Sequence, residues 1–329
     1  MEEKKIEKRK ICFISSKANL SRGSYRIHVH DLNNYFNKID VTSAINPRNT
    51  RDYDIVIYDK GVELKLNTGQ LKGAVTPDRA NIPFLKACDF IIVGSVEEKE
   101  SLLSYNKNCF IFPQIESMYL NAAPKYHIQK EEIIIGYHGN PNHLNHLTLG
   151  LKDALEKLAK TTQIKLLITR STLTSYKEWT KGVPNVNIEW VDWNLKTIKE
   201  TIQRFDIGIV PNISEIEKAN TLNSNIPDGL YDSDIKIRFK NKSNIGRALV
   251  LFQLGIPVIA DITPSNMHVL ANPDNGYAVL TEAGWYAALK ELCCHKRRSF
   301  VAENARKEAD RLYNPTDWAK KLYANLSKI

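Results

Sequence analysis

Five closely spaced cations are the residues of this sequence best suited to bind an anion. They are Lys236, Arg238, Lys240, Lys242 and Arg247, and no acidic residue stands between Ile235 and Arg247. The first four occupy alternate positions, so an extended backbone would turn them toward one side. Ammonium groups beside a forked guanidinium suit a diphosphate. The alternative is a solvated basic loop, which is the common fate of a charge run.

A buried helix is predicted directly after these cations, beginning at Lys242 or Ser243. Its apolar residues lie nearly all around it, which is typical of a helix enclosed in an α/β layer; they are Ile245, Ala248, Leu249, Val250, Leu251, Phe252 and Leu254. Gly255 would end the helix, and Pro257 cannot extend it. Because its first turn contains no acid, its free N–H groups and positive dipole end would face the same anion as Arg247.

The elements that would position this site alternate between apolar strands and helices. The expected strands are continuous apolar runs, at residues 11–15, 55–58, 74–75, 90–93 and 110–112, and then at 133–137, 165–169, 186–191 and 207–211. Such runs, separated by helical patterns, indicate parallel sheets with helices on both faces. The polar, proline-bearing stretch 122–132 predicts a linker. We therefore expect two doubly wound α/β lobes, whose ligands bind beyond the carboxyl ends of the strands.

The composition narrows the class of protein. The chain has 329 residues and a formal net charge of +9, which suits a nucleic acid, an anionic membrane surface or a phosphorylated substrate. We expect a cytoplasmic protein, because neither a signal peptide nor a run of 18 apolar residues is present. Five cysteines without CxxC spacing argue against a disulfide framework or a zinc knuckle.

No metal site is expected either. His138, His143 and His146 do not repeat a known zinc-ligand spacing. Asp232 and Asp234 form a metal-binding triplet with Ser233 in appearance only.

Several stretches of the second half resemble the C-terminal domain of a GT-B fold glycosyltransferase, most like the retaining family 4. They include IIIGYHGNPNHLNHLTLGLKDALEKL, VNIEWVDWNLKTIKETIQRFDIGIVP and FKNKSNIGRALVLFQLGIPVIA. The first half resembles this group less strongly, through FISSKANLSRGSYRIHVHDL and ACDFIIVGSVEEKESLL. The resemblance implies two Rossmann-like domains facing a cleft: residues 1–128 on the acceptor side and 129–312 on the donor side. A C-terminal helix, 313–329, would cross back to the first domain.

The resemblance implies that the anion is the diphosphate of a nucleotide sugar. Arg247 and Lys242 would stabilise the charge that grows on the leaving group, and Lys240, Ser243 and Asn244 would be further contacts. The family's two glutamates, separated by seven residues, are absent here: counted back from Gly255, their positions hold Lys242 and Val250. This sequence is therefore similar to relatives that have a lysine, a serine or asparagine, and an arginine at the start of this helix.

Further candidates on the donor side follow the strands of the second lobe. Gly139 and His138 lie in the turn after strand 133–137, where glycine would let the backbone approach a phosphate or sugar. Trp193 and Asn194 follow strand 186–191, where relatives meet the nucleobase. For Trp193, packing at the rim is the alternative.

The first lobe offers two candidates. Arg26 stands at the start of the first helix and would reach the cleft, or it is a surface cation. Asp78 follows a strand end where relatives hold a catalytic or acceptor-side residue. A helix N-cap is the alternative for Asp78.

The resemblance implies a glycosyltransferase that moves a sugar with retention from a nucleotide sugar, most often a UDP-sugar in that family, to a saccharide or lipid-linked saccharide. The leaving phosphate would assist the incoming hydroxyl, since no carboxylate pair is evident for double displacement. No cofactor or metal would be required. The positive charge suits peripheral contact with an anionic membrane, and no nucleic-acid partner is expected. The alternatives are a nucleotide-sugar epimerase of the same fold, a non-catalytic relative and a nucleic-acid-binding α/β protein.

Overall fold

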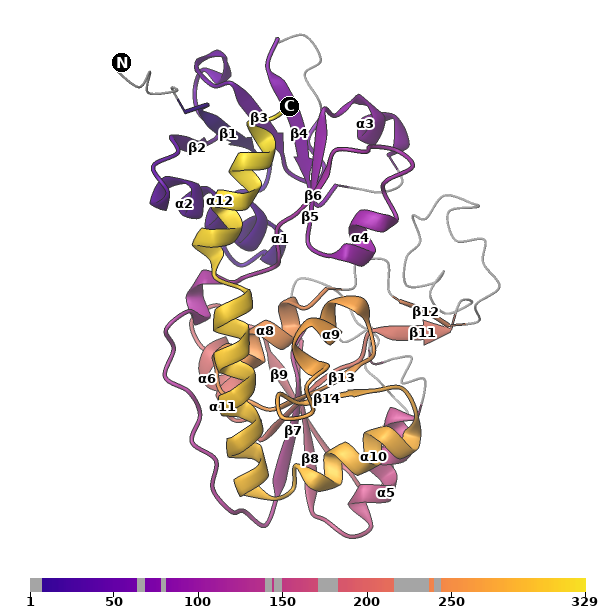
Figure 1. Cartoon of the computed structure of the whole chain (residues 1–329). Helices are drawn as coiled ribbons and strands as arrows, with labels where there is room; N and C mark the ends of the chain where they lie inside the picture. The colour runs from indigo at the N-terminus through magenta and orange to yellow at the C-terminus, as the bar shows by residue number, and fades with distance from the viewer. Residues whose placement is uncertain are drawn as a thin grey trace. The chain divides into compact units, whose positions relative to one another are not determined.

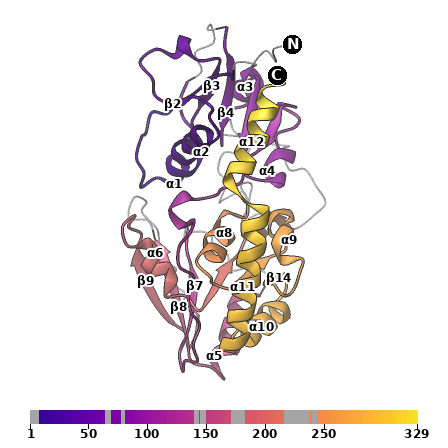
Figure 2. The same cartoon turned by 60° about the vertical axis from the view of Figure 1, so that its left-hand side comes forward.

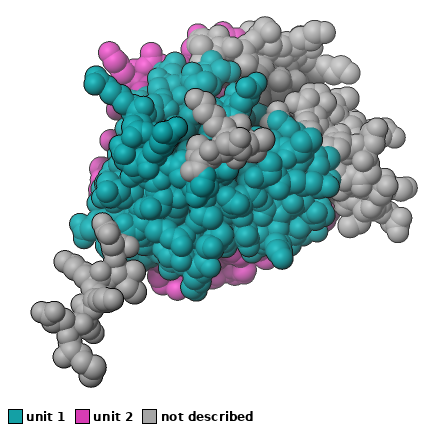
Figure 3. Space-filling model, turned by 90° about the horizontal axis from the view of Figure 1, so that it is seen from above, with its two compact units in different colours: residues 1–117, 225–230, 313–329 teal, residues 118–224, 231–312 magenta. Residues whose placement is uncertain are grey.

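The computed structural model describes residues 8–63, 69–77, 81–139, 144, 150–170, 183–215, 237–239 and 244–329. These residues form two compact units, which Figure 3 colours separately. The first unit contains the described residues up to Ser117 and returns at Tyr313–Ile329; the second contains those from Met118 to Leu312. Residues 118–128, which the sequence placed in the first domain, thus belong to the second unit.

A parallel six-stranded sheet forms the centre of the first unit, in the order β2-β1-β3-β4-β5-β6 (Figure 1). The strands are β1 Ile11–Ile14, β2 Ser43–Ile45, β3 Ile55–Tyr58, β4 Leu71–Val75, β5 Phe90–Val93 and β6 Cys109–Ile111. Every residue of β3 and β5 is buried, as their continuous apolar runs predicted. The expected parallel pairing in this half of the chain is therefore confirmed.

Helices cover this sheet, and the last helix of the chain is one of them. The helical segments are α1 Gly23–Tyr25, the π-helical η1 Arg26–Asp31, α2 Leu32–Lys38, α3 Ile82–Ala87, α4 Val96–Glu100 and α12 Pro315–Leu326, with 3₁₀ turns η2 Thr50–Asp52 and η3 Ser117–Tyr119. Helix α12 lies beside α2 in both views (Figure 2), and the ring of Tyr323 meets Phe36 edge-on, 6.5 Å between centroids. The C-terminal helix therefore packs on the N-terminal part of the chain.

The second unit repeats the architecture with the strand order β14-β13-β10-β7-β8-β9, all parallel. The strands are β7 Ile133–Tyr137, β8 Ile164–Arg170, β9 Asn187–Asp192, β10 Ile207–Val210, β13 Val258–Asp261 and β14 Tyr277–Val279. A separate antiparallel pair joins β11 Ile213–Glu215 to β12 Ile237–Phe239. Because the chain builds outward from β7 in both directions, the topological switch point lies between β7 and β10.

The helices of this unit are α5 Leu151–Ala159, α6 Ile198–Gln203, α8 Gly246–Gln253, α9 Pro264–Leu270, α10 Glu282–Glu291 and α11 His295–Leu312. Helix α8 packs closely on the sheet because Gly208 has no side chain: a Cβ there would lie 2.5 Å from a methyl carbon of Leu251. All residues of α8 except Arg247 are buried, as predicted. Within the described residues, no helix has both the length and the apolarity needed to cross a bilayer.

The start of α8 differs from the prediction. The helix begins at Gly246 rather than at Lys242 or Ser243, because Asn244 is not helical. The side-chain Oδ1 of Asn244 accepts a hydrogen bond from the N–H of Gly246 at 2.9 Å, which turns the chain into the helix. At the other end, Gly255 ends the helix with a φ of +68°, as predicted.

Candidate functional site

Arg247 occupies the first turn of α8, at the carboxyl ends of two neighbouring strands. Its Nη1 donates a hydrogen bond to the phenolic oxygen of Tyr137 at 2.7 Å, and its Nη2 donates to Oδ1 of Asn212. The guanidinium also lies near the Tyr137 ring, with its Cζ 5.5 Å from the centroid. Tyr137 ends β7, and Asn212 follows β10. Strands on both sides of the topological switch point therefore hold one guanidinium.

The electrostatic state of Arg247 follows from these partners. Both side-chain acceptors are neutral, and no carboxylate of the described residues pairs with Arg247. The first turn of α8 contains no acidic residue. A guanidinium that has no counterion among the described residues thus lies beside the positive end of a helix dipole, and this combination favours an anionic ligand.

His138 and Gly139 follow β7 and lie against the same arginine. The imidazole Nε2 of His138 donates to the main-chain carbonyl of Arg247 at 3.0 Å. Burial lowers the pKa of His138 to about 4, and the charge of Arg247 acts in the same direction, so the ring is neutral at pH 7. Gly139 has a φ of +128°, and a Cβ on it would lie 3.1 Å from Cδ of Arg247. The backbone conformation favours glycine here, and a Cβ would require the Arg247 side chain to shift by a few tenths of an ångström.

Asn212 is fully buried and is fixed through its backbone. Its N–H donates to Oδ2 of Asp261, the last residue of β13, at 2.5 Å. The main-chain carbonyl of Asp261 accepts from Nδ2 of Asn266 at 2.9 Å. Sequence reasoning did not select Asn212 or Tyr137. The signal that could have found them is their position at the carboxyl ends of β7 and β10, the two strands that flank the switch point.

Trp193 and Asn194 lie at the edge of this sheet. They follow β9, which is two strands and therefore roughly 10 Å from β7. The N–H of Trp193 donates to the carbonyl of Arg170 at 2.6 Å. The Oδ1 of Asn194 accepts from the N–H of Lys196, and its carbonyl accepts from Ile198, so Asn194 leads into α6. Their contact with a nucleobase stays a prediction.

Arg26 lies in the first unit and is in a different electrostatic state. The side chain is buried, and its Nη2 and Nε donate to Oε2 of Glu116 at 2.7 and 3.2 Å. Its Nη1 donates to the carbonyl of Leu20. Burial raises the pKa of Glu116, and the charge of Arg26 opposes that rise. The guanidinium of Arg26 already has Glu116 as its counterion. Its role in donor binding stays a prediction.

The remaining candidates lie outside the described residues: Asp78, Lys240, Lys242 and Ser243, with Lys236, His143, His146, Asp232 and Asp234. Of the cationic stretch, Arg238 belongs to β12 and Arg247 to α8. Within the part of the chain that is described, no cluster of three His, Cys, Asp or Glu side chains could hold a metal ion.

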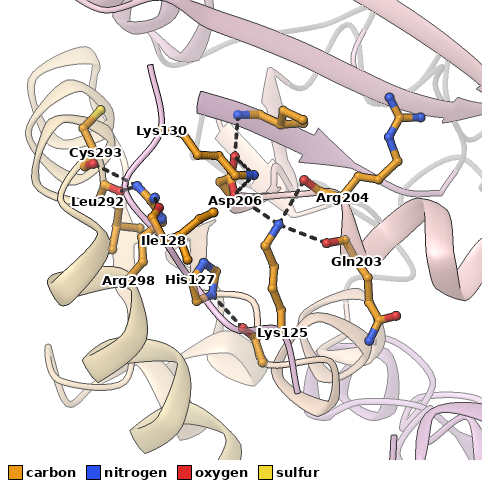
Figure 4. Close-up of polar contacts among 12 residues, drawn as sticks. Lys125, His127, Ile128, Lys130, Gln203, Arg204, Asp206, Leu292, Cys293 and Arg298 are labelled. Atoms are coloured by element: carbon orange, nitrogen blue, oxygen red, sulfur yellow. Dashed lines mark hydrogen bonds and ion pairs between the residues drawn. The ribbon is translucent and has the colours of Figure 1, made fainter. Parts of the chain in front are cut away.

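A second group of buried charges lies at the amino end of the same sheet (Figure 4). Asp206, just before β10, accepts from Nζ of Lys125 at 3.0 Å, from Nζ of Lys130 at 2.9 Å and from the N–H of Ile134 at 3.0 Å. Burial alone would raise the pKa of Asp206, but these three donors hold it below its ordinary value. The negative charge of Asp206 thus has two ammonium partners within the fold, and this cluster stabilises the second unit.

Two further side chains of this cluster bind the chain segment that enters the second unit. Arg298 is fully buried and donates to the carbonyls of Leu292, Cys293 and Ile128 at 2.8, 2.8 and 2.9 Å. The Nε2 of His127 donates to the carbonyl of Gly255 at 2.9 Å. These contacts explain why residues 118–128 group with the second unit.

The known proteins that this chain resembles share its structure at low sequence identity. No protein-family model matches the sequence, and no curated protein matches it. Solved structures do resemble it. Anabaena Alr3699/HepE in complex with UDP and glucose has a TM-score of 0.62 at 11% identity, over 98% of this chain and 100% of that one. A glycosyltransferase from Rickettsia africae has 0.61 at 13%, over 98% and 99%. WaaG, a glycosyltransferase involved in lipopolysaccharide biosynthesis, has 0.57 at 10%, over 95% and 98%.

The chain has a GT-B fold. This confirms the predicted fold class of two Rossmann-like doubly wound domains. The assignment to family 4, and to its branch without the two glutamates, stays a prediction because sequence identities of 10–13% show the fold alone.

Proposed function

We propose that this protein is a glycosyltransferase that binds the diphosphate of a UDP-sugar at the start of α8. The observation that carries the proposal is the guanidinium of Arg247, which is held by neutral acceptors beside the switch point of the second sheet. Ligands of open α/β sheets bind at this point. Support also comes from HepE, which has the same fold and was solved with UDP and with UDP-glucose.

The proposed chemistry places positive donors where negative charge develops. As the bond between the anomeric carbon and the diphosphate oxygen breaks, charge grows on the β-phosphate, and Arg247 with Lys242 would stabilise it. Lys240, Ser243 and Asn244 are the further proposed contacts. A charged hydrogen bond is worth about 1.5–3 kcal/mol. If it forms only in the transition state, one such bond accelerates transfer by roughly 10- to 150-fold.

The proposed reaction proceeds with retention, the leaving phosphate assisting the incoming hydroxyl on the same face of the sugar. Asp78 is the proposed acceptor-side residue, and Trp193 with Asn194 would meet the nucleobase. No metal or cofactor is part of the proposal.

The proposed acceptor is a saccharide or a lipid-linked saccharide. The structure of TarM was solved with fondaparinux, α-GlcNAc-glycerol and UDP, and WaaG is involved in lipopolysaccharide biosynthesis. The net charge of +9 supports peripheral contact with an anionic, cytoplasm-facing membrane surface. Nucleic acid is not a proposed partner.

Nucleotide binding tests the proposal. Thermal-shift and calorimetric titrations with UDP, GDP, ADP and CMP should show a preference for UDP, and UDP should be released from a UDP-sugar when a membrane extract supplies the acceptor. Interconversion of two UDP-sugars without transfer would indicate an epimerase. Salt-dependent binding of random DNA with no response to any nucleotide would contradict the proposal.

A further inference from the structure

Two residues that were not predicted from the sequence fix the position of the Arg247 guanidinium. The phenolic oxygen of Tyr137 and the amide oxygen of Asn212 each accept from a different Nη atom, so the guanidinium plane is fixed at two points. Both side chains are enclosed in the interior, because both residues have no solvent exposure. We call Tyr137 and Asn212 the arginine clamp.

The clamp depends on the sheet and not on α8. Tyr137 ends β7, and Asn212 is tied to β13 through its N–H bond to Asp261 at 2.5 Å. Neither residue is a neighbour of Arg247 in sequence, at separations of 110 and 35 residues. The clamp therefore transmits the position of three parallel strands to one side chain on a helix.

Because both clamp side chains are neutral, they do not neutralise the positive charge of Arg247. A carboxylate at either position would hold the guanidinium equally well but would neutralise it, as Glu116 does for Arg26 in the first unit. A phenol and an amide fix the group and leave its charge available to an anion. Among the described residues, Nδ2 of Asn212 has no hydrogen-bond partner, and its Oδ1 accepts from the arginine.

The main chain around Arg247 is held as well. The neutral imidazole of His138 donates to its carbonyl at 3.0 Å, and Gly139 leaves room for its side-chain methylenes. The backbone of Arg247 and the end of its side chain are thus fixed separately. Such fixing reduces the reorganisation needed when charge develops on a bound ligand.

We propose that Tyr137 and Asn212 are positioning residues that hold Arg247 toward the diphosphate of the donor and act only through that arginine. The inference rests on the proposed function, since it takes a nucleoside diphosphate as the ligand. It assigns a role to two neutral, buried side chains that contact no ligand themselves.

A double-mutant cycle on UDP binding tests this proposal. Tyr137→Phe removes the acceptor and keeps the ring, and it should weaken UDP binding about five- to tenfold. Asn212→Ala should act in the same direction. In the Arg247→Ala background, neither change should weaken binding further. Tyr35→Phe is the matched control, because its hydroxyl is buried like that of Tyr137 but has no hydrogen-bond partner among the described residues. It should leave UDP affinity unchanged.

A second measurement needs no nucleotide. Phenylglyoxal labelling of Arg247, followed by peptide mass spectrometry, should be severalfold faster in Tyr137→Phe and Asn212→Ala than in the wild type or Tyr35→Phe. Thermal melting of each variant checks that it is folded.

The outcomes separate the two proposals. Wild-type protein that binds no nucleotide would overturn the proposed function, while labelling would still report whether the clamp exists. Wild-type binding of UDP with additive effects of Tyr137→Phe and Arg247→Ala would overturn the positioning role alone. Equal labelling rates in all variants would overturn the clamp itself.

Discussion

The two ends of the parallel sheet in the second unit both contain partly buried cations, but the partners of those cations differ. At the amino end, one carboxylate of Asp206 receives the ammonium groups of Lys125 and Lys130 (Figure 4). At the carboxyl end, Arg247 donates to the neutral oxygens of Tyr137 and Asn212, and no carboxylate of the described residues pairs with it. The first arrangement contains a counterion, and the second contains none among the described residues.

The presence or absence of a carboxylate partner helps to distinguish cations that stabilise the fold from cations that bind a ligand. Burying a charge is costly unless it is paired or hydrogen-bonded. Where a cation has a counterion in the fold, the ion pair offsets the desolvation cost, so removing the counterion should lower the free energy of unfolding. Where the counterion would come from a bound anion, removing the cation should weaken binding of that anion.

The largest effect is expected from Asp206→Ala. The change leaves the ammonium of Lys125 in a buried site without its counterion and the N–H of Ile134 without its acceptor. We expect a loss of about 3–5 kcal/mol in the free energy of unfolding, measured by urea denaturation. Glu303→Gln, which breaks the exposed pair with Lys307, is the control and should change nothing measurable. Equal stability of the two variants would break the contrast at the amino end.

The next effect is a pH dependence carried by His127. Burial lowers its pKa from 6.5 to about 4, so between these values the unfolded chain binds a proton that the folded protein does not. The stability from neutral His127 is therefore present above pH 6.5 and is lost as the pH falls toward 4. The loss is about 3 kcal/mol, followed by urea denaturation across this range.

His127→Gln should flatten this dependence, although His138 contributes with the same sign. His295→Gln, at a more exposed position bonded to Gln129, should keep the wild-type profile. If wild type and His127→Gln lose stability in parallel below pH 6.5, the burial argument for His127 is wrong.

Arg247→Ala should change binding more than stability. Loss of one charged hydrogen bond to the diphosphate should weaken UDP binding by about 1.5–3 kcal/mol, measured by calorimetry. Arg311→Ala is the control, because that arginine is exposed and already paired with Glu308 at 2.6 Å. Unchanged UDP affinity of a folded Arg247→Ala variant would remove this residue from the site.

The smallest effect is expected from Gly139→Ala. The added Cβ would lie 3.1 Å from Cδ of Arg247, at a φ of +128° that side-chain-bearing residues rarely adopt. We expect UDP affinity to fall by about 1 kcal/mol. Gly61→Ala, at a φ of +81° with no atom within 4 Å of the new Cβ, should carry a backbone cost but leave UDP affinity unchanged. Equal affinities of the two variants would show that space beside Arg247 is not limiting.

Much of the fold could be predicted because its signals are local. The continuous apolar runs predicted β3, β5 and β10, and the all-round apolar pattern predicted the buried α8. Gly255 marked the end of that helix. Its start was predicted too early, because Asn244 bonds to the N–H of Gly246 and forms the turn itself. Side-chain hydrogen bonds of this kind compete with helix geometry and are not visible in hydrophobic periodicity.

The partners of the cations could not be predicted in this way. Arg26 and Arg247 both stand near the start of a helix, and both were candidates for the donor. The structure places Glu116, 90 residues away in sequence, against Arg26 and no carboxylate of the described residues against Arg247. Whether an arginine is matched depends on groups within a few ångströms, which the chain brings together only when it folds.

The sequence by itself determined that this chain forms α/β layers, with cations before a buried helix, because apolar periodicity and helix signals act over neighbouring residues. The tertiary structure alone decided which cation has a counterion among the described residues and which does not. It placed Tyr137 and Asn212 around Arg247, and Asp206 between Lys125 and Lys130. The physical reason is that the energy of a buried charge is set by its neighbours in space, and strand order in the sheet determines those neighbours.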